Sequence, residues 1–180
     1  RETFTHYSQA LYLSAGTGNE TRSVQQVQNM ARFGVTVIVG FADYIIKLAQ
    51  VAREEGLEPG KDIPIRMIVG HMGRENREAI SDAWGGAEIY DLYGVGDTGI
   101  VAFESKDREG MYVHEDAYLL ELIDSESGKN VSHGSPGNMV ISVLFKDDIY
   151  PVIRFDTKDV TSFETKKSSI GYSFNRITGF

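Results

Sequence analysis

The hydrophobic period of the chain changes near its middle, and this change limits the possible folds more than any other feature. Up to about Gly99, short apolar runs alternate with segments whose apolar residues recur at helical spacing. Beyond Gly99, apolar and polar residues alternate with a period of two, as in strands with one buried face. The sequence therefore predicts an α/β part followed by an antiparallel β part.

The first part predicts strands that alternate with helices. The predicted strands are residues 10–13, 35–39, 65–69 and 87–92. Asn19 is the expected cap of the first helix and Gly34 its end. The continuous β-branched run at 35–39 is typical of a strand buried on both faces. This order of elements predicts a parallel sheet with crossover helices.

The second part predicts an antiparallel meander or small barrel. Its alternating segments are residues 118–124, 139–145 and 150–155, with turn-rich sequences between them. Charge and glycine concentrate at 104–110, so we place a boundary there. The expected division is an α/β subdomain at 1–104 and an antiparallel β subdomain at 105–180.

Composition narrows the partners and the setting. The 180 residues contain 18 Lys and Arg against 26 Asp and Glu, a net charge of −8, which argues against nucleic-acid binding. No cysteine is present, so disulfides and thiolate zinc sites are excluded. The longest apolar stretch is too short for a membrane span and no signal peptide is visible, so we expect a cytoplasmic protein without membrane contact.

A parallel sheet binds its ligands beyond the carboxyl ends of its strands, which directs attention to four loops. These are residues 16–18, 40–41, 70–73 and 93–99. The glycine-rich sequence at 14–19 lacks the Lys of a phosphate loop, and a tight turn between strand and helix is the better interpretation. Asp97 could bind a hard cation such as Mg²⁺, and a plain Asx turn explains it equally well.

Two further positions are candidates for binding, and none is a candidate for catalysis. Asp159 ends the last alternating segment and could accept two hydrogen bonds from a ribose diol, although local ion pairs are the commoner role of such a charged junction. His71 is the only one of four histidines at a predicted strand end, where it could contact a ligand. No serine lies in a nucleophile-elbow pattern.

Three ordered segments resemble a known family. Residues 90–97 (YDLYGVGD) resemble the Tyr-Gly-x-x-Glu motif of adenylate-forming enzymes. Residues 111–124 resemble the Gly-Leu-His-x-x-Glu-Asp stretch of phenylacetate–CoA ligases, and residues 148–159 resemble that family's Met-Pro-Leu-Ile-Arg-Tyr-Arg-Thr-x-Asp. The resemblance spans nearly the whole chain and is to the phenylacetate–CoA ligase family.

The resemblance implies an activity, its cofactors and the roles of several residues. Such enzymes activate a carboxylic acid with ATP and Mg²⁺ as an acyl-adenylate, and CoA then displaces AMP to give the acyl-CoA. Phenylacetate-like aryl acids are the implied substrates. The implied adenine contacts are Gly70 and His71, with Asp91, Tyr93 and Gly94 framing adenine and the α-phosphate. Asp97 stands at the metal-linked position, and Asp159 at the ribose-binding position.

The chain also departs from the family pattern. Asp97 is one methylene shorter than the usual Glu, Met72-Gly73 replaces Glu-Pro, and Asp156 replaces a basic residue. The family's phosphate loop is expected before Arg1, and its hinge and carboxyl-terminal domain after Phe180. The sequence thus reads as an internal fragment that is inactive alone, of a parent enzyme able to form homodimers.

Two other functions are compatible with the same residues. One is a relative that transfers AMP without making a thioester, such as a deazaflavin-coenzyme adenylylating synthetase. The other is a non-catalytic nucleotide-binding module, which the substitutions at Asp97 and Asp156 favour slightly.

Overall fold

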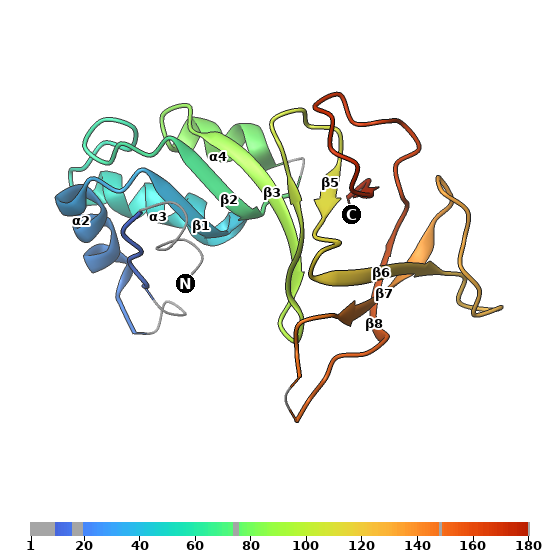
Figure 1. The fold of residues 1–180 in the computed structure, drawn as a ribbon. Coiled ribbons are helices and arrows are strands. Elements are labelled where there is room, and N and C mark those ends of the chain that lie inside the picture. Colours follow the sequence, from blue (N-terminus) through green and yellow to red (C-terminus); the bar gives the residue numbers. More distant parts are fainter. Residues whose placement is uncertain (1–9, 16–19, 74–75, 148, 180) are drawn as a thin grey trace.

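The computed structural model describes residues 10–15, 20–73, 76–147 and 149–179. Helices and strands alternate first, and strands alone follow (Figure 1). The elements are α2 (Ser23–Phe33), β1 (Val37–Phe41), α3 (Ala42–Glu54), β2 (Met67–His71), α4 (Arg77–Ala83), β3 (Glu88–Val95), β4 (Gly99–Glu104), β5 (Met111–Val113), β6 (Tyr118–Ile123), β7 (Gly137–Val143), β8 (Phe155–Thr161) and β9 (Arg176–Ile177).

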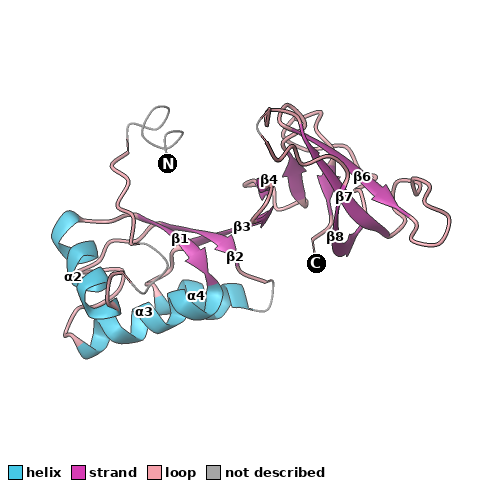
Figure 2. Cartoon of the chain, turned by 90° about the horizontal axis from the view of Figure 1, so that it is seen from below, coloured by secondary structure: helices cyan, strands magenta, loops and turns pink. Residues whose placement is uncertain are grey.

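The described residues form two sheets, and the larger one joins a parallel part to an antiparallel part. Its order is β1-β2-β3-β4-β5-β9, parallel from β1 to β3 and antiparallel from β3 onward. Ile38, Ile68 and Ile89 lie in one register row and are buried in the core that also contains residues of the three helices. The described helices α2, α3 and α4 cover the same face of the parallel part of this sheet (Figure 2).

The smaller sheet has the order β6-β7-β8 and is antiparallel. A second core lies between it and the antiparallel part of the larger sheet. This core includes Tyr93 of β3, Val101 of β4, Met139 of β7 and Phe163. The two sheets are therefore packed together by one shared apolar cluster.

The predicted fold class is confirmed, with a parallel α/β part followed by an antiparallel β part. The helix predicted before Gly34 is present and ends there in the left-handed conformation, but it begins at Ser23 with Arg22 at its N-cap position. The predicted cap Asn19 and the loop at 16–18 lie outside the described residues. The division at 104/105 stays a prediction, since the larger sheet continues across it through β4 and β5.

Three local predictions are wrong. Residues 10–13 form no strand and Leu11 is 76% exposed, because no described strand pairs with this segment. Residues 35–39 are not buried on both faces. The described helices lie against one face of the parallel strands, and Val39 is 50% exposed. Residues 150–154 are irregular and β8 begins only at Phe155, because Pro151 has no N–H to give to a strand ladder.

Within the described part of the chain, none of the helices is both long and apolar enough to cross a lipid bilayer.

Candidate nucleotide-binding site

Asp91 connects the ends of two parallel strands. It lies opposite Gly70 in the β2–β3 register, and its carboxylate accepts a hydrogen bond from the Met72 N–H at 3.0 Å. Arg77 of α4 approaches the other carboxylate oxygen at 3.4 Å, and the Asp91 side chain is 16% exposed. Asp91 therefore fixes the loop after β2 against the start of α4, which is a structural task.

The backbone requires a glycine at position 70. A Cβ atom at Gly70 would lie 1.7 Å from the carbonyl oxygen of Gly40, its partner in β1. This close approach explains Gly70 without any ligand. His71 follows it at the exposed carboxyl end of β2, opposite Phe41.

Tyr93 and Asp159 meet across the junction of the two sheets. The Tyr93 hydroxyl of β3 donates a hydrogen bond of 2.6 Å to Oδ2 of Asp159 in β8, 66 residues away in sequence. Tyr93 is only 5% exposed, and this burial raises the pKa of its hydroxyl above the ordinary 10.0, with the bond to Asp159 raising it further. The phenol is therefore protonated at neutral pH and is a constant donor to the carboxylate.

A bulge in β8 orients Asp159. The β7–β8 register shifts between Asn138 and Val140, and Lys158 has a φ of 68°, in the left-handed region. The Thr157 hydroxyl donates to the Met139 carbonyl at 3.0 Å and accepts from the Asp159 N–H at 3.1 Å. Bulges of this kind redirect a side chain at the edge of a site, and here the redirected side chain is Asp159.

Local ion pairs also occur at this junction, as the alternative interpretation of the sequence expected. Lys158 Nζ lies 2.6 Å from Asp156, and Arg154 lies 3.1 Å from Glu121. In each ion pair at least one of the two side chains is well exposed to solvent, so each pair contributes little to stability. The ion pairs involve Asp156, whereas Asp159 faces Tyr93.

Gly94 and Asp97 lie at the hairpin between β3 and β4. A Cβ atom at Gly94 would lie 2.6 Å from the Gly99 carbonyl oxygen, so this glycine too is required by packing. Asp97 is exposed in the turn, and Lys146 Nζ donates to its backbone carbonyl at 2.7 Å. Among the described residues, no group of three His, Asp or Glu side chains could hold a metal. Asp97 alone can supply one ligand, which fits a cation that takes its other ligands from phosphate oxygens.

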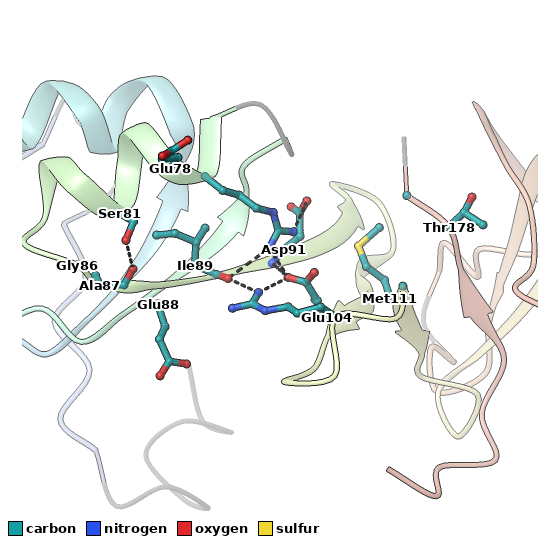
Figure 3. Close-up of a pocket in the computed structure, with 14 residues that line it drawn as sticks. Glu78, Ser81, Gly86, Ala87, Glu88, Ile89, Asp91, Glu104, Met111 and Thr178 are labelled. Carbon is teal, nitrogen blue, oxygen red and sulfur yellow. Dashed lines mark hydrogen bonds and ion pairs between the residues drawn. The ribbon is translucent and has the colours of Figure 1, made fainter. Parts of the chain in front are cut away.

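A cleft of about 680 Å³ lies beside α4, and Asp91 is one of its lining residues (Figure 3). Its charged residues are mostly paired with each other, with Glu104 accepting from Arg77 and Arg108, each at 2.7 Å. The Arg108 guanidinium also stacks 4.0 Å from the centre of the Tyr90 ring. Sequence reasoning missed this cluster. Its one signal was the concentration of charge at 104–110, which we interpreted as a boundary.

Individual relatives match almost the entire chain. No family model matches it. The phenylacetate-coenzyme A ligases of Aromatoleum evansii and Pseudomonas putida are 26% and 27% identical to it over 170 residues, or 91% of this chain. The resemblance to phenylacetate–CoA ligases is confirmed. The chain spans 37% of the length of each of these two relatives.

Solved structures show the same fold. A 2-hydroxyisobutyryl-CoA ligase in complex with 2-HIB-AMP and CoA superposes with a TM-score of 0.80 at 24% identity, over 94% of this chain and 37% of that one. VinN superposes with a TM-score of 0.58 at 16% identity, over 87% of this chain and 42% of that one. This chain thus shares its fold with the corresponding parts of the 2-hydroxyisobutyryl-CoA ligase and of VinN.

The structure locates the segments that resemble phenylacetate–CoA ligases. Residues 90–97 form β3 and its turn, and the described part of 148–159 leads into β8. These two segments meet at the Tyr93–Asp159 hydrogen bond. The fold therefore brings Tyr93 and Asp159 together, and Gly70 and Asp91 together, while Asp97 lies at the hairpin tip.

Proposed function

We propose that the protein to which this chain belongs is an ATP-dependent aryl-acid–CoA ligase. It would activate a phenylacetate-like acid as an acyl-adenylate and pass the acyl group to CoA. The observation that carries this proposal is the Tyr93–Asp159 contact, where two segments that resemble the ligases converge from 66 residues apart. The relatives named phenylacetate-coenzyme A ligase support it, as does the similar fold of a CoA ligase that holds 2-HIB-AMP and CoA.

In this proposal the nucleotide lies beyond the carboxyl ends of β2 and β3. Asp159 binds the ribose hydroxyls, with Tyr93 and Gly94 framing adenine and the α-phosphate. The exposed His71 contacts the base beside Gly70. Because the Asp91 carboxylate already binds Met72 and Arg77, its proposed role is to shape the loop that lines adenine.

We assign Mg²⁺ to Asp97, with phosphate oxygens as the remaining ligands. A bound Mg²⁺ would neutralise phosphate charge, which assists attack by a carboxylate. Lys146, whose ammonium group lies beside the Asp97 carbonyl, adds a second positive charge near the same hairpin. The Mg²⁺ ion and the Lys146 ammonium group would together place two cations where a negatively charged polyphosphate could bind.

The test of nucleotide binding is a thermal-shift titration with a phenylacetyl-adenylate analogue, AMP and ATP–Mg²⁺. Saturation at a hundredfold excess over Kd stabilises a protein by about 2.7 kcal/mol. Asp159→Asn should weaken binding, and Asp156→Asn is the matched control on the same strand. Equal affinities of the two variants would contradict the proposed site.

The test of the reaction uses the longer parent protein. Formation of phenylacetyl-CoA from the acid, ATP and CoA would support the ligase. AMP transfer without an acyl-CoA product would support the adenylylating alternative. We expect the 180-residue chain alone to be inactive, since it spans only 37% of the length of its relatives. Measurable pyrophosphate release by this chain would contradict that expectation.

A further inference from the structure

The Tyr93–Asp159 pair has an asymmetry that bears on ligand binding. A carboxylate has two oxygens and about four acceptor positions, and Tyr93 occupies Oδ2 at 2.6 Å. Among the described residues, no hydrogen bond to Oδ1 of Asp159 is found. Oδ1 of Asp159 can therefore still accept hydrogen bonds, while the bond from Tyr93 to Oδ2 sets the orientation of the carboxylate.

Tyr93 is well suited to set that orientation. Its ring is buried in the core shared by the two sheets, so the hydroxyl has little freedom to move. The bulge at Lys158 fixes the backbone of Asp159 from the other side. A short hydrogen bond to an ionised acceptor is among the stronger ones in proteins. Each half of the pair is therefore held by its own sheet.

We propose that Tyr93 is a positioning residue whose hydroxyl holds one oxygen of Asp159 and thereby presents the other to the vicinal diol of a ribonucleotide. This inference rests on the proposed function, because it presumes that a nucleotide binds at Asp159. It adds that the preference for a ribonucleotide over its deoxy analogues depends on the Tyr93 hydroxyl, although this hydroxyl does not itself contact the sugar.

The experiment measures Kd for AMP, 2′-deoxy-AMP and 3′-deoxy-AMP by calorimetry in the intact parent protein. Wild type is expected to prefer AMP over each deoxy analogue. Tyr93→Phe keeps the ring but loses a hydrogen bond to a charged group. The affinity for AMP should therefore fall by on the order of tenfold, while the affinities for the deoxy analogues should hardly change. The ratio between AMP and its analogues should fall toward one.

The matched control is Tyr112→Phe. Tyr112 is a fully buried tyrosine whose hydroxyl also donates to an aspartate, Asp107, and it lies on β5 away from Asp159. This variant should keep the wild-type preference for AMP. Loss of the preference in both variants would overturn the inference, because it would show a general effect of removing a buried hydroxyl.

The remaining outcomes are separable. An equal loss of affinity for all three nucleotides in Tyr93→Phe, or no loss, would overturn the inference and leave the proposed function standing. Absence of AMP binding by folded wild type would overturn the proposed function itself. If Tyr93→Phe does not fold, 4-aminophenylalanine at position 93 keeps the ring with a weaker donor. This substitution should reduce the preference for AMP over the deoxy analogues several-fold, and an unchanged preference would overturn the inference.

Discussion

Arg77 of α4 and Glu104 at the end of β4 form an ion pair of 2.7 Å where the parallel part of the larger sheet meets its antiparallel part. The Glu104 side chain is only 9% exposed. Its Oε2 atom also accepts from Arg108 and from the Asp91 N–H. One carboxylate oxygen thus connects α4, β3 and the segment after β4, which gives Glu104 a structural importance that its sequence position does not suggest.

Glu104→Gln should destabilise the protein by about 2 kcal/mol, because the two guanidinium groups lose a shared and largely buried negative charge. Urea unfolding measures this free energy. Glu58→Gln is the control, since the Arg53–Glu58 pair has side chains 45% and 59% exposed and should change stability by less than about 0.5 kcal/mol. Equal effects of the two substitutions would show that the Glu104 cluster does not stabilise the junction.

Lys158→Gly should leave stability unchanged or raise it by up to about 1 kcal/mol. Lys158 has a φ of 68°, a conformation that glycine adopts without steric strain. Val160→Gly, two residues along β8, should instead cost about 1 kcal/mol, because glycine weakens an ordinary strand. Thermal unfolding compares the two variants. A Lys158→Gly variant as unstable as Val160→Gly would argue against the bulge.

Gly70→Ala should destabilise the protein by about 3 kcal/mol, since the added Cβ would overlap the Gly40 carbonyl oxygen. Gly96→Ala is the control, because a Cβ there meets nothing within 4 Å. Denaturant unfolding of both variants is the measurement. A stable Gly70→Ala variant with altered nucleotide affinity would show that Gly70 serves the ligand and is not required by the sheet.

Stability should fall with rising pH above about 10, and Tyr93 should cause part of the fall. Its folded-state pKa is raised above the 10.0 of an unfolded tyrosine, first by burial and then by the bond to Asp159. The folded state therefore keeps the Tyr93 proton to a higher pH than the unfolded state does. The resulting contribution to the free energy of unfolding is complete below pH 10 and is lost as pH rises toward the folded-state pKa. One such group contributes a slope of at most about 1.4 kcal/mol per pH unit.

Urea unfolding between pH 9 and 11 tests this prediction. Tyr93→Phe should make the slope shallower without abolishing it, because burial also raises the pKa of Tyr112 and Tyr118. A Tyr93→Phe slope identical to that of wild type would contradict the assignment.

The sequence by itself determined the order and type of most elements. Helical spacing of Val24, Val27 and Met30 identified α2, and its end at Gly34 followed from the freedom of glycine to adopt a positive φ. The strand-period segments identified β6 and β7. These are local properties, because spacing and backbone freedom depend on residues near one another in the chain.

The sequence also selected Tyr93 and Asp159 as separate candidates, by position and by resemblance, but not as a pair. Their contact depends on the packing of two sheets and on a bulge that turns Asp159 toward β3. Likewise the nucleotide contact at Asp91 stays a prediction, and only the structure shows that its carboxylate binds Met72 and Arg77. Tertiary structure decided these partners because each contact joins residues far apart in sequence. A local sequence pattern does not specify which distant residue will pack against a given side chain.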